Sequence, residues 1–480
     1  MLEFSLPYNL TVDLAAVADV VAAAIVTTHV LLTKRDVRGS IGWIGLAWLS
    51  PLLGSLLYFL FGINRVARRA ARRRRQTEPE AAFAAETRGS ESGREHSEQT
   101  IAIARVGDRL TRRAVLPGNA ISIFRNGAEA YPAMLDEIRS ARRSIALASY
   151  IFRADRVGNV FIEALRSAHT RGVEVRVLVD GIGGGYFISS ATNELRSSGI
   201  RIERFLHEWL PWRMSFLNMR NHKKLLIVDG AVGFTGGLNL GAENLSQSRP
   251  AYAVDDVHFR IQGPAVSMLM QTFAKDWAFT CGESLKGDVW WPEIPPVGSV
   301  MLRGISSGPD DDEGSIETLF AAVVGSAKSR LRIVTPYFLP DQRLMSDIML
   351  ASMRGVMVEI IVPANSNHKA IDWATRCHLG FFAGPAVALH LTRPPFDHSK
   401  MITVDGHWAG VGSPNWDLRS LRLNFEFLLE CYDAPFVAQL DRLIDEKIAN
   451  STRLTLDHIY ERRFPTKLRD AVARLFLPYL

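Results

Sequence analysis

The chain has 480 residues, a formal net charge of +6 and three cysteines. Its length allows two domains of ordinary size, each able to bury its own core. The three cysteines lack metal-ligand spacing, and the twelve histidines form no H-E-x-x-H motif. This composition argues against a disulfide framework and predicts a reducing compartment and no metal site.

Two apolar segments occupy the first 64 residues. The stretch 41–62 carries no charge and, at about 1.5 Å per residue, is long enough to cross a bilayer core. Pro51 and Gly54 are placed to kink it. The stretch 14–33 contains Asp19, whose burial in lipid is costly, so an interfacial helix is the alternative there. We predict a transmembrane hairpin, not a cleaved signal peptide, because no basic residue precedes the apolar run.

Seven arginines between residues 65 and 75 follow the hairpin, against three basic residues between its two segments. By the positive-inside rule, the rest of the chain is expected in the cytoplasm. The arginines could also bind anionic lipid. Residues 76–100 lack apolar periodicity and predict a flexible tether, so 65–117 is assigned to a basic juxtamembrane segment and linker.

The remainder of the chain repeats itself. "ARRSIALASYIF", ending at Phe152, parallels "AKSRLRIVTPYF", ending at Phe338, and Arg-Gly-Val at 171–173 recurs at 354–356. Each copy predicts a strand, a helix and a second strand, which is the α/β pattern. We expect a first domain at 118–297, a second at 298–450 and a C-terminal helical tail at 451–480 that docks on the body.

Each half carries one copy of a motif, and the copies are 176 residues apart: "HKKLLIVDGAVGFTGGLN" and "HSKMITVDGHWAGVGSPN". Each copy predicts a strand, a tight Asp-Gly turn and a second strand, with side chains two apart on one face. The matched positions are His222 and His398, Lys224 and Lys400, Asp229 and Asp405, Gly236 and Gly412, Gly237 and Ser413, and Asn239 and Asn415.

The motif residues predict phosphoryl transfer. Two histidines at one phosphorus permit double displacement, in which one attacks and the other protonates the leaving alcohol. The lysines and asparagines would hold the charge on the equatorial oxygens. Asp229 and Asp405 precede glycine at a hairpin tip, so either catalysis or the turn explains them.

The doubled H-x-K-x4-D-x6-G-[GS]-x-N pattern resembles the phospholipase D superfamily. Segments such as "TPYFLPD" and "NWDLRSLRLNFE" resemble its bacterial cardiolipin synthase branch, and the resemblance covers nearly the whole chain. It implies an α/β fold of two pseudo-symmetric domains that share one active site, a phosphohistidine intermediate, and neither metal nor cofactor. It implies that His222 is the nucleophile and His398 the general acid and base, although the pseudo-symmetry leaves the reverse order open.

The resemblance also implies roles for other residues. The catalytic set comprises His222, Lys224, Asp229, His398, Lys400 and Asp405, and the substrate-binding set comprises Asn239, Asn415, Gly237 and Ser413. In this family a downstream carboxylate orients each histidine: Glu426 matches it for His398, and Asp256 is our choice for His222. Val254 stands where the branch usually has Trp, which leaves Asp255 as an alternative, and Asn367 stands where Asp is expected.

The expected function is transfer of a phosphatidyl group from one phosphatidylglycerol to another, giving cardiolipin and glycerol. Transfer to water would make the protein a phospholipase D. A superfamily nuclease or phosphodiesterase is another alternative, but much of the positive charge lies in the juxtamembrane arginines, so no nucleic-acid partner is expected. A lipid-binding scaffold is disfavoured because neither motif copy is degraded. We expect a multi-pass protein of the bacterial inner membrane.

Overall fold

A computed structural model describes residues 8–34, 37–62, 98–185, 187, 189–207, 219–245, 253–309, 314–382, 387–455, 457–458 and 461–475. The arginine cluster and most of the predicted tether, which precede residue 98, lie outside these ranges. The chain divides into two compact units. The smaller contains Met1–Arg72 with Leu210–Leu217, and the larger contains Arg73–Trp209 with Asn218–Leu480.

The smaller unit consists of apolar helices. They are α1 (Tyr8–Thr33), α2 (Val37–Leu49), α3 (Pro51–Leu57) and the π-turn η1 (Tyr58–Gly62). Among the described residues one helical stretch, Ala16–Thr33 of α1, is long and apolar enough to cross a membrane. Tyr58 joins the helices, since its hydroxyl lies 2.7 Å from His29 Nδ1 and its ring packs edge-on against Trp43.

The stretch 41–62, expected as one helix with a kink at Pro51 and Gly54, is divided between α2 and α3. Ser50 leaves helical geometry, with φ −146° and ψ 79°, and a new helix begins at Pro51. Proline lacks an N–H, and its ring collides with the carbonyl four residues earlier. A Cβ on Gly54 would lie 2.3 Å from the Leu46 carbonyl oxygen, so α3 packs closely on α2. The sequence favoured 41–62 over 14–33 as the spanning segment. In the structure the long apolar helix is instead α1, which contains Asp19.

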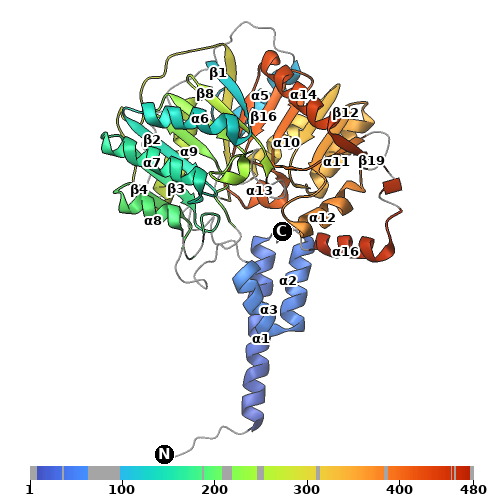
Figure 1. The fold of residues 1–480 in the computed structure, drawn as a ribbon. Coiled ribbons are helices and arrows are strands. Elements are labelled where there is room, and N and C mark those ends of the chain that lie inside the picture. Colours follow the sequence, from blue (N-terminus) through green and yellow to red (C-terminus); the bar gives the residue numbers. More distant parts are fainter. Residues whose placement is uncertain are drawn as a thin grey trace, which may run out of the picture. The chain divides into compact units, whose positions relative to one another are not determined.

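The larger unit is built on a sheet of 15 strands in the described residues (Figure 1), in the order β19-β13-β12-β10-β15-β16-β18-β9-β1-β8-β6-β5-β2-β3-β4. The first half supplies β1 (Leu116–Arg125), β2 (Ser144–Ser149), β3 (Glu174–Asp180), β4 (Arg201–Phe205), β5 (Leu225–Val228), β6 (Val232–Gly236) and β8 (Val257–Gln262). The second half supplies β9 (Val300–Ser307), β10 (Arg330–Val334), β12 (Met357–Pro363), β13 (Val387–Thr392), β15 (Met401–Val404), β16 (Trp408–Gly412), β18 (Glu426–Cys431) and β19 (Ser451–Leu454). Read outward from the central antiparallel pair β1–β9, the two halves follow the same strand order.

Helices cover the sheet on both faces (Figure 1). In the first half they are α6 (Asn126–Ser140), α7 (Arg156–Thr170), α8 (Ser190–Ser197), η3 (Ala242–Asn244) and α9 (Val266–Cys281). In the second they are α10 (Ser315–Ser326), α11 (Gln342–Met353), α12 (Lys369–Leu379), α13 (Leu418–Arg422), α14 (Ala434–Ala449) and α16 (Phe464–Leu475). Each half buries its own apolar cluster.

The predicted strand–helix–strand repeat is confirmed. β2 pairs in parallel with β3, and β10 pairs in parallel with β12. Asp155 caps the start of α7 and Asp341 caps the start of α11 by accepting from backbone N–H groups. Gly172 and Gly355 follow these helices at φ 90° and 92°, a conformation that favours glycine.

Two segments differ from the predicted linker and tail. Helix α5 (Glu98–Thr111) lies in the predicted linker, and its Ile103 is buried in the core of the second half. Asp108 of α5 forms an ion pair with Arg303 at 2.5 Å. The predicted helical tail begins with strand β19, which pairs with β13, and continues with α16, which packs on α12.

Candidate active site

Both motif copies form the predicted hairpin. β5 and β6, and likewise β15 and β16, are antiparallel partners. Asp229 and Gly230 have φ values of 51° and 65°, and Asp405 and Gly406 have 51° and 71°. Positive φ at both central residues matches the type I′ turn that suits the twist of a hairpin. The H-x-K residues precede β5 and β15 rather than lying within them.

The two halves bring the two histidines together. The ring centroids of His222 and His398 are 6.4 Å apart, with an angle of 84° between the planes. About one tenth of each side chain is exposed. Reacting atoms approach to about 3–3.5 Å before bond formation, so a phosphorus between the rings would be within reach of both.

Each histidine is hydrogen-bonded to a carboxylate of the other half. His222 Nδ1 lies 3.0 Å from Glu426 Oε2, and His398 Nδ1 lies 2.7 Å from Asp256 Oδ2. Both carboxylates are fully buried. An ionised carboxylate only accepts, so Nδ1 carries the hydrogen in each ring and the Nε2 lone pair remains for chemistry.

The predicted pairing of Glu426 with His398 and Asp256 with His222 is therefore wrong: the pairs are crossed. The backbone explains the crossing. The amide of His222 donates to the Phe425 carbonyl, and that of His398 donates to the Asp255 carbonyl. Each motif thus begins alongside the carboxylate-bearing strand of the opposite half. Two short strands, β7 (Val254–Asp255) and β14 (Phe396–Asp397), pair in parallel at this crossing.

Asp255, the predicted alternative to Asp256, does not hydrogen-bond through its carboxylate to any histidine that the structure describes. Its side chain forms an ion pair with Lys447 at 2.9 Å. Proximity along the chain favoured pairing within each half, and no signal in a single sequence reports the exchange.

Burial dominates the electrostatics of the site. Loss of solvent lowers the pKa of His222 and of His398 to about 4, although the neighbouring carboxylates act in the opposite direction. Burial also lowers the pKa of Lys224 to about 7 and that of Lys400 to about 8. Each ammonium donates to the backbone carbonyl of its own motif histidine. Near pH 7 the two imidazoles are therefore largely uncharged, and the positive charge of the site rests on the two lysines.

The catalytic roles predicted for Asp229 and Asp405 do not fit their positions. Each lies at the far end of a strand from its histidine, roughly 20 Å away for seven extended residues. The Asp229 carboxylate accepts from the backbone N–H groups of residues 142–144, and that of Asp405 from residues 328–330. Their placement is that of turn residues that fasten the motif hairpin to the preceding strand.

Gly237 and Ser413 also differ from the predicted substrate contacts. A Cβ on Gly237 would lie 2.2 Å from an Asp256 carboxylate oxygen, so glycine leaves room for that carboxylate. Ser413 Oγ donates to Glu426 at 2.5 Å. The backbone N–H groups of both residues are bonded within the sheet region, so these positions support the orienting carboxylates.

The two asparagines lie in different settings. Asn239 Oδ1 accepts from the Ile151 amide at 3.3 Å. The Asn415 side chain hydrogen-bonds to Asp417, and its buried Oδ1 has no partner among the described residues. A buried amide oxygen without a partner is costly, which fits a position completed by a ligand or water.

Several residues at the site escaped sequence analysis. Tyr150 packs edge-on against His222 with centroids 5.1 Å apart, and the Lys224 ammonium lies 5.3 Å from the Tyr150 ring centroid. Tyr337 packs edge-on against His398 at 6.4 Å and donates to Asn367. Isolated tyrosines carry no sequence signal of this role.

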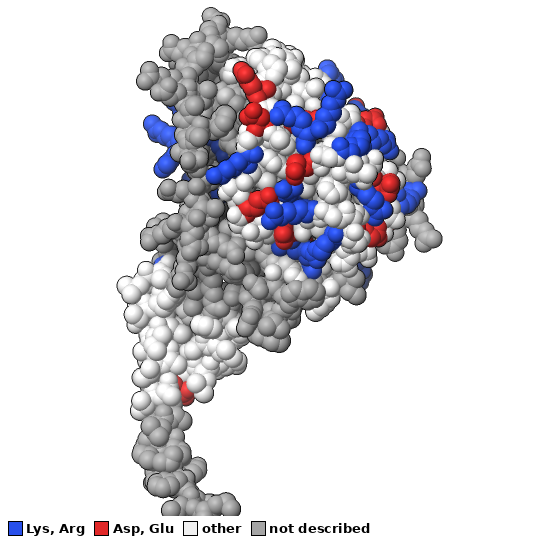
Figure 2. All heavy atoms as spheres, turned by 90° about the vertical axis from the view of Figure 1, so that its left-hand side faces the viewer, with Lys and Arg blue, Asp and Glu red and all other residues white. Residues whose placement is uncertain are grey.

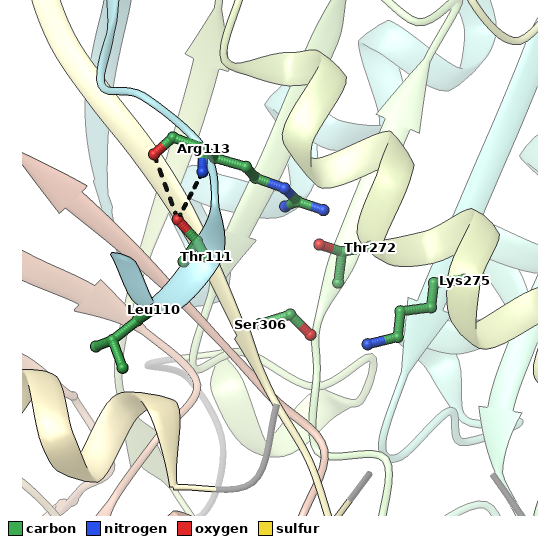
Figure 3. Close-up of a pocket in the computed structure, with 6 residues that line it drawn as sticks. All are labelled: Leu110, Thr111, Arg113, Thr272, Lys275 and Ser306. Carbon is green, nitrogen blue, oxygen red and sulfur yellow. Dashed lines mark hydrogen bonds between the residues drawn. The ribbon is translucent and has the colours of Figure 1, made fainter. Parts of the chain in front are cut away.

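A pocket away from the histidines is lined by Leu110, Thr111, Arg113, Thr272, Lys275 and Ser306 (Figure 3). It lies between the end of α5, α9 and β9. None of the motif residues lines it. Within the described ranges, His, Cys, Asp and Glu side chains form no group of three or more that could hold a metal ion.

Comparison with known proteins agrees with this geometry. Residues 134–277 and 321–448 match the family model described as cardiolipin synthase, PLD-like domain. The chain belongs to the cardiolipin synthase family of phospholipase D-like proteins. Residues 17–62 match a second family model, described as phospholipase D-nuclease N-terminal.

Relatives in this family align over nearly the whole chain. Cardiolipin synthase A of Pseudomonas aeruginosa is 31% identical, covering 94% of this chain and 93% of the relative. Cardiolipin synthase of Geobacillus kaustophilus is 29% identical, covering 94% and 90%. The crystal structure of phosphatidylserine synthase from Haemophilus influenzae has a TM-score of 0.59 at 17% identity and covers 79% of this chain and 100% of that one. This likeness shows the fold.

Proposed function

We propose that the protein is a cardiolipin synthase that transfers a phosphatidyl group between two phosphatidylglycerol molecules. The observation that carries this proposal is the facing pair of histidines, each with Nδ1 on a buried carboxylate. The names of the relatives, which align over 94% of the chain, supply the substrate class.

The reaction has two steps. His398 enters this step as the imidazolium, with its second proton on Nε2. Nε2 of His222 attacks the donor phosphorus, the bond from phosphorus to the glycerol oxygen breaks, and His398 gives the Nε2 proton to that oxygen. His398 then removes a proton from a hydroxyl of the second phosphatidylglycerol. That oxygen attacks phosphorus, the phosphorus–nitrogen bond breaks, and cardiolipin leaves. Lys224 and Lys400 stabilise the negative charge on the transferred group.

The surroundings of the two carboxylates support this division of roles. Glu426 accepts from Ser413, Ser420 and Asn424 as well as from His222. Asp256 accepts from His398 at the shorter distance and from one backbone amide. A carboxylate engaged by fewer donors leaves more negative charge to stabilise an imidazolium, which favours His398 as the group that carries the proton.

The N-terminal unit would hold the enzyme in the bacterial inner membrane, with α1 as a span and α2 and α3 completing the hairpin. The arginines after the hairpin favour a cytoplasmic catalytic unit by the positive-inside rule. A membrane anchor supports a lipid acceptor, because it keeps the site within a layer of lipid alcohols. Protease treatment of spheroplasts tests the orientation: cleavage of the catalytic unit from outside would contradict it.

The alternatives keep the same residues but change the acceptor or the donor. Transfer to water would release phosphatidic acid. A nuclease would need a basic track for nucleic acid. On the face of the larger unit in Figure 2, lysines and arginines alternate with acidic residues in its described part, which does not favour this reading.

One experiment separates these functions. Purified full-length protein is supplied with phosphatidylglycerol in detergent micelles, and the products are identified by mass. Cardiolipin with equimolar glycerol is the expected result. Phosphatidic acid as the main product would show that the protein is a hydrolase. If no lipid is turned over and the protein instead cleaves a nucleic acid, the protein is a nuclease.

A further inference from the structure

Helix α16 carries a row of apolar side chains on its exposed side, which we call the α16 ridge. The four members recur at spacings of four, four and three residues, which places them along one side of a helix. Phe464 at one end is 75% exposed and Leu475 at the other is 72% exposed. Contiguous exposed apolar surface marks a site of contact with another protein or with a membrane. The ridge consists of Phe464, Leu468, Val472 and Leu475, all of them exposed.

The opposite side of α16 is occupied by packing within the larger unit. α16 lies against α12 (Figure 1), and its Ala473 belongs to a small apolar cluster that includes Ala374 of α12. Asp470 is fully buried on this side and forms ion pairs with Arg462 at 2.5 Å and with Arg469 at 2.7 Å. These contacts fix the rotation of α16 about its axis. The ridge is therefore held outward by the packing of the helix.

Positive charge accompanies the ridge. Residues 461–475 contain five arginines and lysines and two acidic residues, an excess of three positive charges, and one of the two acids is the buried Asp470. By helical spacing, Lys467 and Arg474 follow one edge of the ridge. The Arg474 guanidinium lies 5.7 Å from the ring centroid of Phe381, an exposed side chain that extends the apolar surface. A basic amphipathic helix of this kind suits the interface of a bilayer with anionic lipid.

Helix α12 connects the ridge with the reacting centre. The N-cap residue of α12 is His368, whose ring centroid lies 6.3 Å from that of Tyr337. Tyr337 in turn packs edge-on against His398. α12 has 11 residues, so it is about 16 Å long at ~1.5 Å per residue. One short helix thus separates the histidines from α16, and a surface bound by the ridge lies near the site.

We propose that the α16 ridge and Phe381 dock the catalytic unit on a bilayer that contains anionic phospholipid. The apolar side chains enter the boundary between headgroups and acyl chains, and the neighbouring cations remain among the headgroup phosphates. This contact is additional to the N-terminal helices. Its use rests on the proposed function, because docking holds the histidines next to the layer that contains phosphatidylglycerol.

Photochemical cross-linking identifies what covers the ridge. Full-length protein with benzoylphenylalanine in place of Phe464, or in a second preparation Leu468, is reconstituted into vesicles of phosphatidylglycerol and phosphatidylcholine and irradiated. We expect a phospholipid adduct on the peptide that contains α16, and fewer adducts in vesicles of phosphatidylcholine alone. The same analogue at Val160, which is exposed on α7 of the first half, is the matched control and should give no lipid adduct.

Other cross-links would overturn the inference. A product joined to the N-terminal unit would mean that the chain covers its own ridge, and a product joined to α16 of a second molecule would mean that the ridge is a dimer interface. Absence of a lipid adduct at both positions would also contradict docking. These outcomes do not depend on catalysis, so they are separate from the test of the proposed function.

A charge placed on the ridge separates docking from chemistry. Leu468→Glu should lower cardiolipin synthesis on vesicles roughly tenfold, because a carboxylate replaces a buried apolar side chain at the lipid boundary. Synthesis from short-chain phosphatidylglycerol dispersed as monomers should stay within about twofold. Val160→Glu is the control and should change neither rate.

Equal losses with both substrates, or an unchanged rate on vesicles, would contradict a docking role for the ridge. Wild-type protein that forms no cardiolipin from either substrate would instead overturn the proposed function, while the cross-link would still decide whether α16 contacts lipid. Melting temperature shows whether Leu468→Glu is folded. If it is not, the cross-link at Phe464 decides.

Discussion

The two histidine environments are alike in layout and unequal in chemistry. His222 meets a glutamate that three other side chains also engage, whereas His398 meets an aspartate whose other donor among the described residues is one backbone amide. The histidines, lysines, aspartates and asparagines of the motif are the same in both copies, but Gly237 matches Ser413, which donates to Glu426. The inequality therefore arises from this one motif position and from the other groups around the carboxylates. Duplicated residues can therefore take different roles when the neighbours of their partners differ.

Removing either imidazole should have the largest effect. His222→Ala and His398→Ala should each lower cardiolipin synthesis by roughly 10³-fold or more, because the first variant lacks the nucleophile and the second lacks the group that carries the proton. Melting temperature should change little. Near wild-type activity in either variant would contradict the single site.

The same pair can be told apart by trapping. With labelled phosphatidylglycerol and an acid quench, the label is expected on the peptide that contains His222. Label on the peptide that contains His398 would reverse the two roles and leave double displacement intact.

Changing the carboxylates should have the next largest effect. Asp256→Asn should lower kcat by about 10²-fold, because the amide neither stabilises the His398 imidazolium nor fixes its Nδ1–H form. Glu426→Gln should cost less if His222 acts as an uncharged nucleophile. Asp255→Asn is the adjacent control, since its carboxylate pairs with Lys447. A larger loss for Glu426→Gln than for Asp256→Asn would invert the comparison.

The pH profile should show a smaller, graded effect. The pKa values of about 7 for Lys224 and about 8 for Lys400 mean that both are cationic below these values and lose charge as the pH rises. Loss of the cations weakens binding of an anionic phosphodiester, so kcat/KM should fall by roughly tenfold between pH 7 and pH 9. Rates measured at low substrate concentration, with melting temperature followed in parallel, give the profile. A flat or rising profile would contradict it.

The turn aspartates should have the smallest effect on chemistry. Asp229→Ala removes an acceptor of several backbone hydrogen bonds and places alanine at φ 51°. We expect the free energy of unfolding to fall by about 2–4 kcal/mol, while activity per folded molecule stays within about twofold. Asp405→Ala should behave alike. Denaturant unfolding beside kcat checks both, and a large loss of kcat in stable protein would restore a catalytic role.

Much of this architecture was predictable from the repeat. Two motif copies in register indicated paired hairpins, and the repeated Arg-Gly-Val indicated two like strand–helix–strand units, in which Gly172 and Gly355 take the same positive φ. Local chemistry produces these features, so local sequence reports them. The crossed pairing of Glu426 and Asp256 depends on which segments lie side by side across the halves, and local sequence does not encode that.

The remaining errors have similar causes. Pro51 was recognised as a kink, but the close packing of Gly54 on Leu46 that turns it into a break involves contacts beyond one helix. Helix α5 was assigned to the linker, although Ile103 packs into the second core, because its polar flanks resemble those of a tether.

The crossed carboxylates also bear on how the chain matures. Synthesis proceeds from the N-terminus, so His222 is made 204 residues before Glu426. Until the last strands fold, the first half presents an imidazole without the carboxylate that fixes its proton. Asp256 in the same half likewise has no histidine partner until His398 is made and folded. A partly made or truncated protein that ends before Glu426 therefore lacks one of the two histidine–carboxylate pairs.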